Sequence, residues 1–94
     1  MIRYTVHFTG RIQGVGFRYT VIRIGEDHKA AGFVQNLHDG RVLLAIEGTP
    51  ADLDMFVADI RRRMAHYVTD HSVVESQATG EFGDSDFGAI SVRY

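Results

Sequence analysis

The chain has 94 residues, a length that favours one domain over residues 1–94, and 45% of them are apolar, which excludes a disordered protein. It contains no cysteine, which excludes disulfide bonds, thiol nucleophiles and zinc–thiolate sites. Ten basic against 12 acidic residues give a net charge of −2, whereas nucleic-acid-binding modules usually carry a basic surplus, so no nucleic-acid partner is expected.

The sequence contains no sign of targeting to a membrane. No apolar run approaches the roughly 20 residues that span a bilayer. The first residues, Met1 to Thr5, lack the apolar stretch of a signal peptide. We therefore expect a cytoplasmic protein without a membrane partner, and we expect it to be a monomer.

Residues 2 to 8 alternate between apolar and polar side chains, the period typical of a strand with one buried face. The loop from Gly10 to Arg18 follows, with three glycines in its first seven positions, and can bend sharply. From about residue 17 the apolar spacing predicts a helix whose buried face comprises Phe17, Val21, Ile24 and His28. Gly25 falls within this helix, where we expect it to allow close approach to a sheet.

Two further strands are predicted from Gly32 to Leu37 and from about Arg41 to Glu47. The residues Asp39-Gly40 between them are a strong signal for a hairpin turn, because both residue types can adopt positive φ.

A second helix is predicted to start with Thr49 as its N-cap, Pro50 in its first position and Asp52 completing a capping box. The residues of its expected core face are Leu53, Phe56, Val57, Ile60 and Met64.

The last third of the chain predicts a strand from His71 to Thr79, an exposed acidic loop from Gly80 to Asp86 and a final strand from Gly88 to Tyr94. The complete order is β-α-β-β-α-β plus a short C-terminal strand. This order favours the ferredoxin-like sandwich, an α+β fold in which an antiparallel sheet carries two helices on one face. Because many unrelated functions use this fold, function must be read from the site.

The loop from Gly10 to Arg18 leads into a helix N-terminus, where backbone N–H groups are unpaired and the helix dipole favours an anion. Glycines let successive N–H groups point inward as an anion-binding nest. The Arg18 guanidinium can hold a phosphate through two parallel hydrogen bonds. We interpret the loop as a phosphate site, although a glycine-rich loop by itself is more often only a tight connection.

Two segments carry a family resemblance. The string Gly10-Arg11-Ile12-Gln13-Gly14-Val15-Gly16-Phe17-Arg18 closely resembles the phosphate-binding signature of the acylphosphatase family. The segment Gly32-Phe33-Val34-Gln35-Asn36, followed by Gly40, Val42 and Gly48, resembles the second signature of that family in type and spacing. The resemblance runs from Ile2 to about Met64 and returns at Arg93-Tyr94. It implies the ferredoxin-like fold and hydrolysis of acyl phosphates without metal or cofactor.

The resemblance also implies residue roles. Asn36 would orient the attacking water, and Arg18 would bind the phosphoryl oxygens. The phosphate would lie against backbone N–H groups of Gln13, Gly14, Val15, Gly16, Phe17 and Arg18. The chemistry agrees, because a carboxylate leaving group, whose conjugate acid has a pKa near about 4, needs little help from a general acid. Positioning and charge stabilisation then suffice.

Other interpretations stay open. Asn36 alone, at a strand end before a turn, would more often serve local hydrogen bonding. The domain could hold a phosphorylated metabolite without hydrolysing it, an alternative that stays open because similar domains occur at the front of large maturation proteins that handle carbamoyl phosphate. A ferredoxin-like RNA binder is a weaker alternative, because the basic surplus and the exposed aromatic pair are missing.

Several features have plainer readings. The five histidines show no pair at metal-ligand spacing on one helix face, so no metal site is expected. The run Arg61-Arg62-Arg63 suits a helix C-terminus, and the carboxylates Asp84 and Asp86 suit a solvated loop. The chain departs from the family pattern at Phe8, Ile12, residues 28–31, residues 65–70 and Ile90. These departures affect packing and loop shape more than the phosphate site.

Overall fold

The computed structural model describes residues 1–85 and 89–94. The elements, in chain order, are β1 (Ile2–Gly10), α1 (Phe17–Gly25), β2 (Ala31–Asn36), β3 (Val42–Gly48), α2 (Pro50–Arg63), β4 (Val68–Gln77) and β5 (Ile90–Arg93). This is the predicted β-α-β-β-α-β order with a short C-terminal strand.

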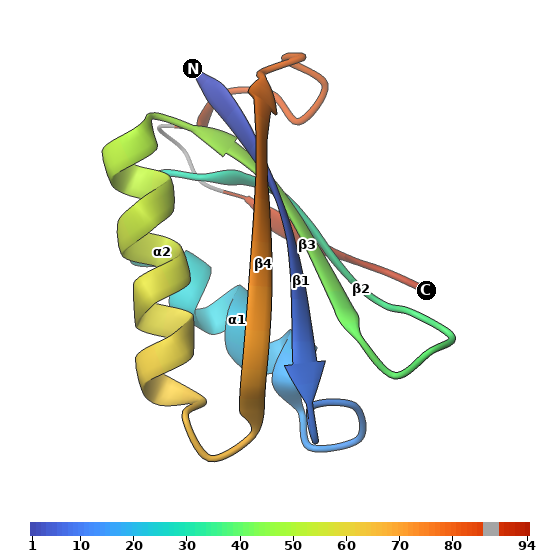
Figure 1. Cartoon of the computed structure of the whole chain (residues 1–94). Helices are drawn as coiled ribbons and strands as arrows, with labels where there is room; N and C mark the ends of the chain where they lie inside the picture. Colours follow the sequence, from blue (N-terminus) through green and yellow to red (C-terminus); the bar gives the residue numbers. More distant parts are fainter. Residues whose placement is uncertain (86–88) are drawn as a thin grey trace.

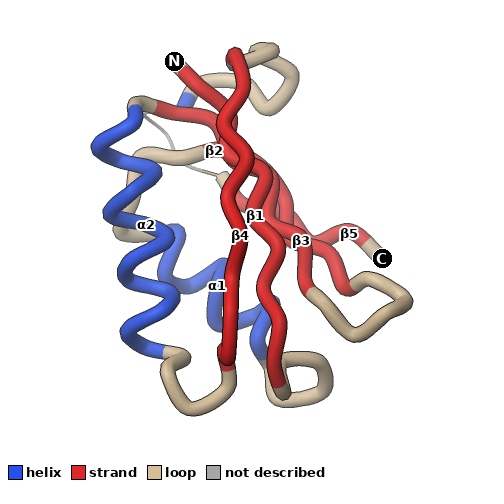
Figure 2. Tube along the Cα trace, viewed as in Figure 1, coloured by secondary structure: helices blue, strands red, loops and turns tan. Residues whose placement is uncertain are grey.

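The five strands form one sheet in the order β4-β1-β3-β2-β5. β1 pairs antiparallel with β3 and β4, and β3 pairs antiparallel with β2. The terminal β5 joins the edge of the sheet parallel to β2. Both helices cover the same face of this sheet (Figures 1 and 2), so the predicted ferredoxin-like sandwich is confirmed.

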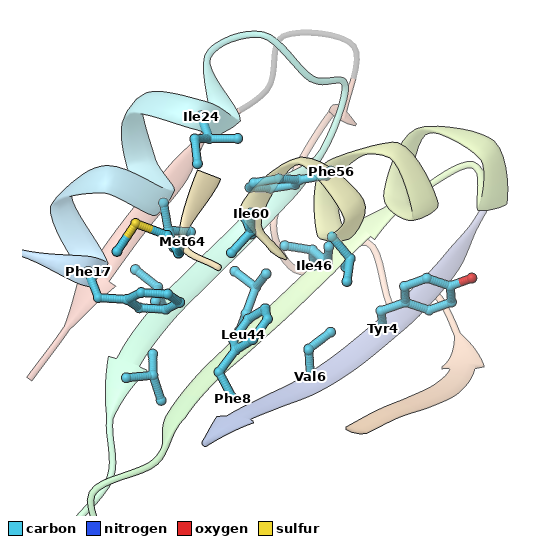
Figure 3. Packing of buried hydrophobic residues seen from close by; sticks show 14 of the residues in the cluster. Tyr4, Val6, Phe8, Phe17, Ile24, Leu44, Ile46, Phe56, Ile60 and Met64 are labelled. Atoms are coloured by element: carbon cyan, nitrogen blue, oxygen red, sulfur yellow. The ribbon is translucent and has the colours of Figure 1, made fainter. Parts of the chain in front are cut away.

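The core lies between the sheet and the two helices, where apolar side chains from both layers meet (Figure 3). The alternation in β1 places Tyr4, Val6 and Phe8 on the helix side of the sheet, where they are buried. The predicted start of α2 is confirmed, since the Thr49 hydroxyl accepts a hydrogen bond from the Asp52 N–H at 3.2 Å. The predicted core face of α2 is buried as well, through Leu53, Phe56, Val57, Ile60 and Met64.

The first helix is shorter than its apolar spacing predicted. It ends at Gly25, so His28 lies in the turn that follows and the prediction that it extends the helical face is wrong. The chain tightens there, because the Glu26 N–H donates to the Arg23 carbonyl, only three residues back. The His28 ring is still covered: it stacks on Phe56 with a centroid distance of 5.2 Å.

Gly25 allows a close approach, as predicted, although it ends the helix rather than lying in its middle. A Cβ at this position would lie 2.8 Å from Cγ1 of Ile90 in β5 and 3.2 Å from Cζ of Phe56 in α2. The end of α1 therefore packs against both an edge strand and the second helix.

The hairpin between β2 and β3 forms where it was predicted. Of the two turn residues Asp39 and Gly40, only Gly40 uses positive φ, at 92°, and within the described residues positive φ is confined to glycines. The Leu37 N–H donates to the Arg41 carbonyl at 2.8 Å, and the Gly40 N–H donates to the Leu37 carbonyl at 3.2 Å. Asp39 instead uses its carboxylate, which accepts hydrogen bonds from N–H and Nε of Arg41.

The C-terminal third differs from the prediction at its boundaries. β4 begins at Val68 instead of His71, because it pairs with β1 along its whole length, as far as Gly10. The predicted exposed loop is partly covered: Ser85 is buried, and the Phe82 ring packs edge-on against Phe33 at 5.8 Å. The predicted loop residue Asp86 and strand residue Gly88 lie outside the described residues.

Glu47, near the end of β3, holds the segment after β4. Its carboxylate accepts hydrogen bonds from the N–H and hydroxyl of Thr79 and from the N–H of Gly80, at 2.8 to 2.9 Å. Burial raises the pKa of Glu47. The hydrogen bonds from Thr79 and Gly80 and the charge of the nearby Arg3 lower it by more than burial raises it, so the pKa lies below the usual value of 4.5. The ionised carboxylate thus stabilises the fold.

We expect the substitution Glu47→Gln to lower the free energy of unfolding at pH 7 by about 1–3 kcal/mol, because an ionic acceptor of several hydrogen bonds is lost. A lowered folded-state pKa contributes stability above the usual value of 4.5, and this contribution disappears as the pH falls through the folded-state pKa. Urea unfolding at pH 7 and at pH 3 should therefore show a gap between wild type and variant that shrinks in acid. The substitution Glu26→Gln, at an exposed position, is the control. If the stability difference between wild type and Glu47→Gln stayed constant with pH, the stabilising role of the ionised Glu47 carboxylate would be contradicted.

Candidate active site

A cavity of about 320 Å³ lies where the loop after β1, the start of α1, the end of β2 and the C-terminal segment with β5 meet. The residues that line it come from these segments: Ile12, Gly14, Gly16, Phe17, Arg18, Tyr19, Asn36, Val92 and Tyr94. The predicted loop and the predicted Asn36 are thus brought together, although 18 positions separate Arg18 from Asn36 in the sequence.

The loop reaches α1 through two glycines in the left-handed region. Gly14 has φ 83° and Gly16, the N-cap of the helix, has φ 74°. A Cβ on either glycine would have no atom within 4 Å, so both face open space. The first N–H groups of a helix have no intrahelical acceptor. In α1 these groups follow directly after Gly16, which faces the open space. This geometry suits an anion.

The rear of the loop is firmly anchored in the protein. Ile12 and Phe17 are each 1% exposed, and the Phe17 ring packs edge-on against Phe8 at a centroid distance of 5.4 Å. The Arg11 N–H donates to the Tyr67 carbonyl, just before β4, at 2.9 Å. The departures from the family pattern at Phe8 and Ile12 therefore lie in well-packed positions behind the site.

Arg18 supplies the positive charge. It is half-buried in the first turn of α1, and its guanidinium lies 5.1 Å from the centroid of the Tyr94 ring, a cation–π distance. Among the described residues that line the cavity, Arg18 is the one cationic side chain, and none is Asp or Glu. A doubly charged phosphate therefore meets attraction from the guanidinium and no side-chain carboxylate.

Asn36 ends β2 beside the same cavity, and its register partner is the buried Val42 in β3. Its side-chain Oδ1 is buried, and no described residue donates a hydrogen bond to it. The alternative reading, that Asn36 serves local hydrogen bonding, is therefore not supported for this oxygen. A buried acceptor without a partner is rare in native structures and calls for a ligand or water.

Gln13 and Val15, which were predicted with the other loop residues, do not line the cavity with their side chains. Val15 is 45% exposed. The Gln13 amide turns to the β2–β3 hairpin, where Nε2 donates to the carbonyls of Leu37 and Arg41 at 2.7 and 3.0 Å. The sequence could not indicate these hydrogen bonds, because they join residues 24 and 28 positions apart.

Tyr19 and Val92 also line the cavity and were missed by the sequence analysis. Tyr94 was noted only as part of the family resemblance at the C-terminus. The helical period could have placed Tyr19 next to Arg18, but nothing in the sequence indicated that β5 would bring Val92 beside the loop.

In the part of the chain that the structure describes, none of the remaining charged candidates lines this cavity. Among the residues that the structure describes, no three His, Cys, Asp or Glu side chains form a group that could hold a metal ion. Arg62 and Arg63, in the last turn of α2, both donate to the Asp59 carboxylate. The predicted pair Asp84 and Asp86 falls partly outside the described residues. No helix in residues 1–85 or 89–94 is long and apolar enough to cross a membrane.

The chain is similar in sequence and fold to known proteins. The family model described as acylphosphatase matches residues 4–88. An acylphosphatase from Bacillus subtilis (strain 168) is 42% identical over 79 residues, which are 83% of this chain and 87% of that protein. The crystal structure of acylphosphatase from Bacillus subtilis has a TM-score of 0.83 and 35% identity and covers 100% of both chains.

A longer protein contains the same fold. The crystal structure of T. kodakarensis HypF matches all of this chain with a TM-score of 0.76 and 27% identity, but the match covers only 12% of HypF. The fold therefore also occurs as a small part of a large protein. Because the family model, the relative in sequence and the solved structure agree, the chain belongs to the acylphosphatase family.

Proposed function

We propose that the protein hydrolyses the carboxyl–phosphate bond of acyl phosphates, releasing a carboxylate and inorganic phosphate, and needs no metal or cofactor. The observation that carries the proposal is that Arg18, the start of α1 and Asn36 line one cavity. Family membership supports the reaction type. The residue roles are those that the family resemblance implies, and the placement of Arg18 and Asn36 on one cavity supports them.

In this mechanism, the phosphoryl oxygens accept hydrogen bonds from backbone N–H groups of residues 13–18 and from the Arg18 guanidinium. These donors stabilise the charge that develops on the equatorial oxygens. Asn36 orients a water molecule for in-line attack on phosphorus. Its Oδ1 can accept a hydrogen bond from that water, but its amide cannot take up a proton at neutral pH.

The bond changes balance without a protein base. The water oxygen bonds to phosphorus while the bond from phosphorus to the acyl oxygen breaks, and the electron pair leaves with the carboxylate. One water proton stays on the attacking oxygen and the other passes to a phosphoryl oxygen, so the products are a carboxylate and dihydrogen phosphate. The good leaving group explains why positioning suffices.

We further propose that residues 1–94 act as a single acylphosphatase-like domain, as a monomer in the cytoplasm. The partners are then the acyl phosphate and inorganic phosphate, with no nucleic acid or membrane. The net charge of −2 supports the exclusion of nucleic acid, and the absence of cysteine is compatible with a reducing compartment.

We expect purified protein to hydrolyse benzoyl phosphate in the presence of EDTA, with inorganic phosphate as a competitive inhibitor. Release of benzoate, followed by absorbance, measures the rate. Phenyl phosphate is the matched control. Its leaving group, phenol, has a pKa near about 10, so phenyl phosphate should be hydrolysed far more slowly. Phosphate binding without turnover would favour a domain that holds a phosphorylated metabolite without hydrolysing it. Absence of phosphate binding would contradict both this alternative and acyl phosphate hydrolysis.

A further inference from the structure

We infer that Gln13 is a positioning residue, which holds the Asn36 end of the β2–β3 hairpin at a fixed distance from the phosphate loop. This inference rests on the proposed function, since it concerns how the water-orienting amide is placed. It gives the Gln13 side chain a task separate from that of its backbone N–H group in the loop.

The hydrogen bonds define the connection. Gln13 lies in the middle of the loop, and its Nε2 donates to the Leu37 carbonyl at 2.7 Å and to the Arg41 carbonyl at 3.0 Å. A side-chain amide nitrogen carries two N–H groups, and both are used here. Leu37 and Arg41 are also joined to each other, through the Leu37 N–H and the Arg41 carbonyl at 2.8 Å. The Gln13 amide therefore binds both sides of the hairpin connection, at the residue after β2 and the residue before β3.

These two carbonyls lie next to the catalytic end of the sheet. Leu37 directly follows Asn36, and Arg41 directly precedes Val42, and Asn36 and Val42 are the last register pair between β2 and β3. The Gln13 amide thus closes the ladder one residue beyond Asn36. Any movement of the hairpin base relative to the loop would move Asn36 relative to the phosphate.

The tip of the hairpin beyond this base does not connect it to the loop. Residues 38–40 are exposed, and the ion pair between Arg41 and Asp39 is itself exposed, with side chains 42% and 53% accessible. The other hydrogen bonds found for the loop run elsewhere in the described structure: Arg11 binds Tyr67, and Gly16 accepts from Thr20. Gln13 is therefore the hydrogen-bonded link between loop and hairpin within the described part of the chain.

The expected effect falls on turnover and not on phosphate binding. Misplacing a reacting group by about 1 Å can cost roughly 10²-fold in rate. The backbone N–H groups and Arg18 would remain in place if the Gln13 amide were lost, because Ile12 and Phe17 anchor the loop in the core. A displaced hairpin would then move the water but leave the phosphate bound.

The test uses Gln13→Met, which keeps the length of the side chain but has no N–H donor. We expect kcat on benzoyl phosphate to fall about 10- to 100-fold, while the inhibition constant of inorganic phosphate changes less than about twofold. Gln77→Met makes the same chemical change at an exposed position at the end of β4 and should leave both constants unchanged. An unchanged kcat in Gln13→Met, or an equal loss of phosphate affinity, would overturn the inference.

A double-mutant cycle separates positioning from a general structural role. If Gln13 acts through Asn36, then adding Gln13→Met to Asn36→Ala should lower kcat by less than about twofold more. A merely structural defect would reduce the rate by its full factor in both backgrounds, and that result would overturn the inference.

One measurement does not depend on turnover. In ¹⁵N-labelled protein, Gln13→Met should shift or broaden the side-chain amide resonance of Asn36 and leave that of Gln77 unchanged. An unaltered Asn36 resonance would refute the positioning role even if the wild type hydrolysed nothing, whereas failure of the wild-type assay alone would refute the proposed function. If Gln13→Met does not fold, nuclear Overhauser contacts in the wild type between the Gln13 amide and residues 37–41 decide the matter, and their absence would count against the link.

Discussion

Replacing Arg18 with alanine is expected to lower kcat/KM for benzoyl phosphate by at least about 10²- to 10³-fold, because losing one preorganised donor to a developing charge costs roughly 3–4 kcal/mol. Arg18 is the one cationic side chain among the described residues that line the cavity. No neighbouring lysine or arginine there can replace it. The inhibition constant of inorganic phosphate should therefore rise as well, and steady-state kinetics with phosphate as inhibitor measures both effects.

A matched control lies on the same helix. Arg23 is exposed in the last turn of α1 and does not line the cavity, so Arg23→Ala should leave the kinetic constants near those of the wild type. Arg18→Lys keeps the charge but loses the planar fork that binds two phosphate oxygens at once, and it should recover only part of the activity. Wild-type kinetics in Arg18→Ala would show that the phosphate is bound elsewhere.

Replacing Asn36 with alanine should abolish most turnover and leave phosphate binding nearly intact. The Asn36 Oδ1 is a buried acceptor without a partner among the described residues, and in the proposed mechanism it holds the attacking water and not the phosphate. We expect kcat to fall by about 10²-fold or more, while inorganic phosphate still inhibits at a similar concentration. Kinetics and calorimetric titration with phosphate measure the two quantities.

Gln35 supplies the control for this substitution. It precedes Asn36 on β2, and strand alternation places its side chain on the opposite face of the sheet. Gln35→Ala should therefore change kcat little. If Asn36→Ala instead loses phosphate affinity in proportion to kcat, Asn36 is a phosphate ligand or a structural residue, and the water must be oriented by another group.

Arg18 and Asn36 together make the reading of the site specific. An anion at a helix N-terminus needs only free N–H groups and a dipole, so Arg18 and the loop alone would suit any phosphate-binding protein. Asn36 adds a buried amide oxygen, an acceptor that has no use in simple anion binding. A loss of binding in Arg18→Ala and a loss of turnover alone in Asn36→Ala would assign the two roles separately.

Local patterns in the sequence were enough to predict most of the fold. The alternation through Val6 and the capping sequence at Thr49 both depend on neighbouring residues, and both were confirmed. His28 was misplaced because helical spacing cannot show where the chain tightens into a three-residue turn. The start of β4 at Val68 was missed because pairing with β1, and not the local sequence, extends that strand.

The features of the candidate site likewise fall into those that local sequence predicts and those that depend on tertiary contacts. The sequence by itself determined the loop, its glycines, Arg18 at the helix entry and Asn36 at a strand end, because each depends on a short run of residue types and on the resemblance of two such runs to one family. Only the tertiary structure decided that Asn36 faces the Arg18 cavity, that Val92 and Tyr94 complete it, and that the Gln13 side chain binds the hairpin. Those contacts join segments far apart in the chain, and their geometry is set by strand order and by the packing of α1 against the sheet, which no local pattern encodes.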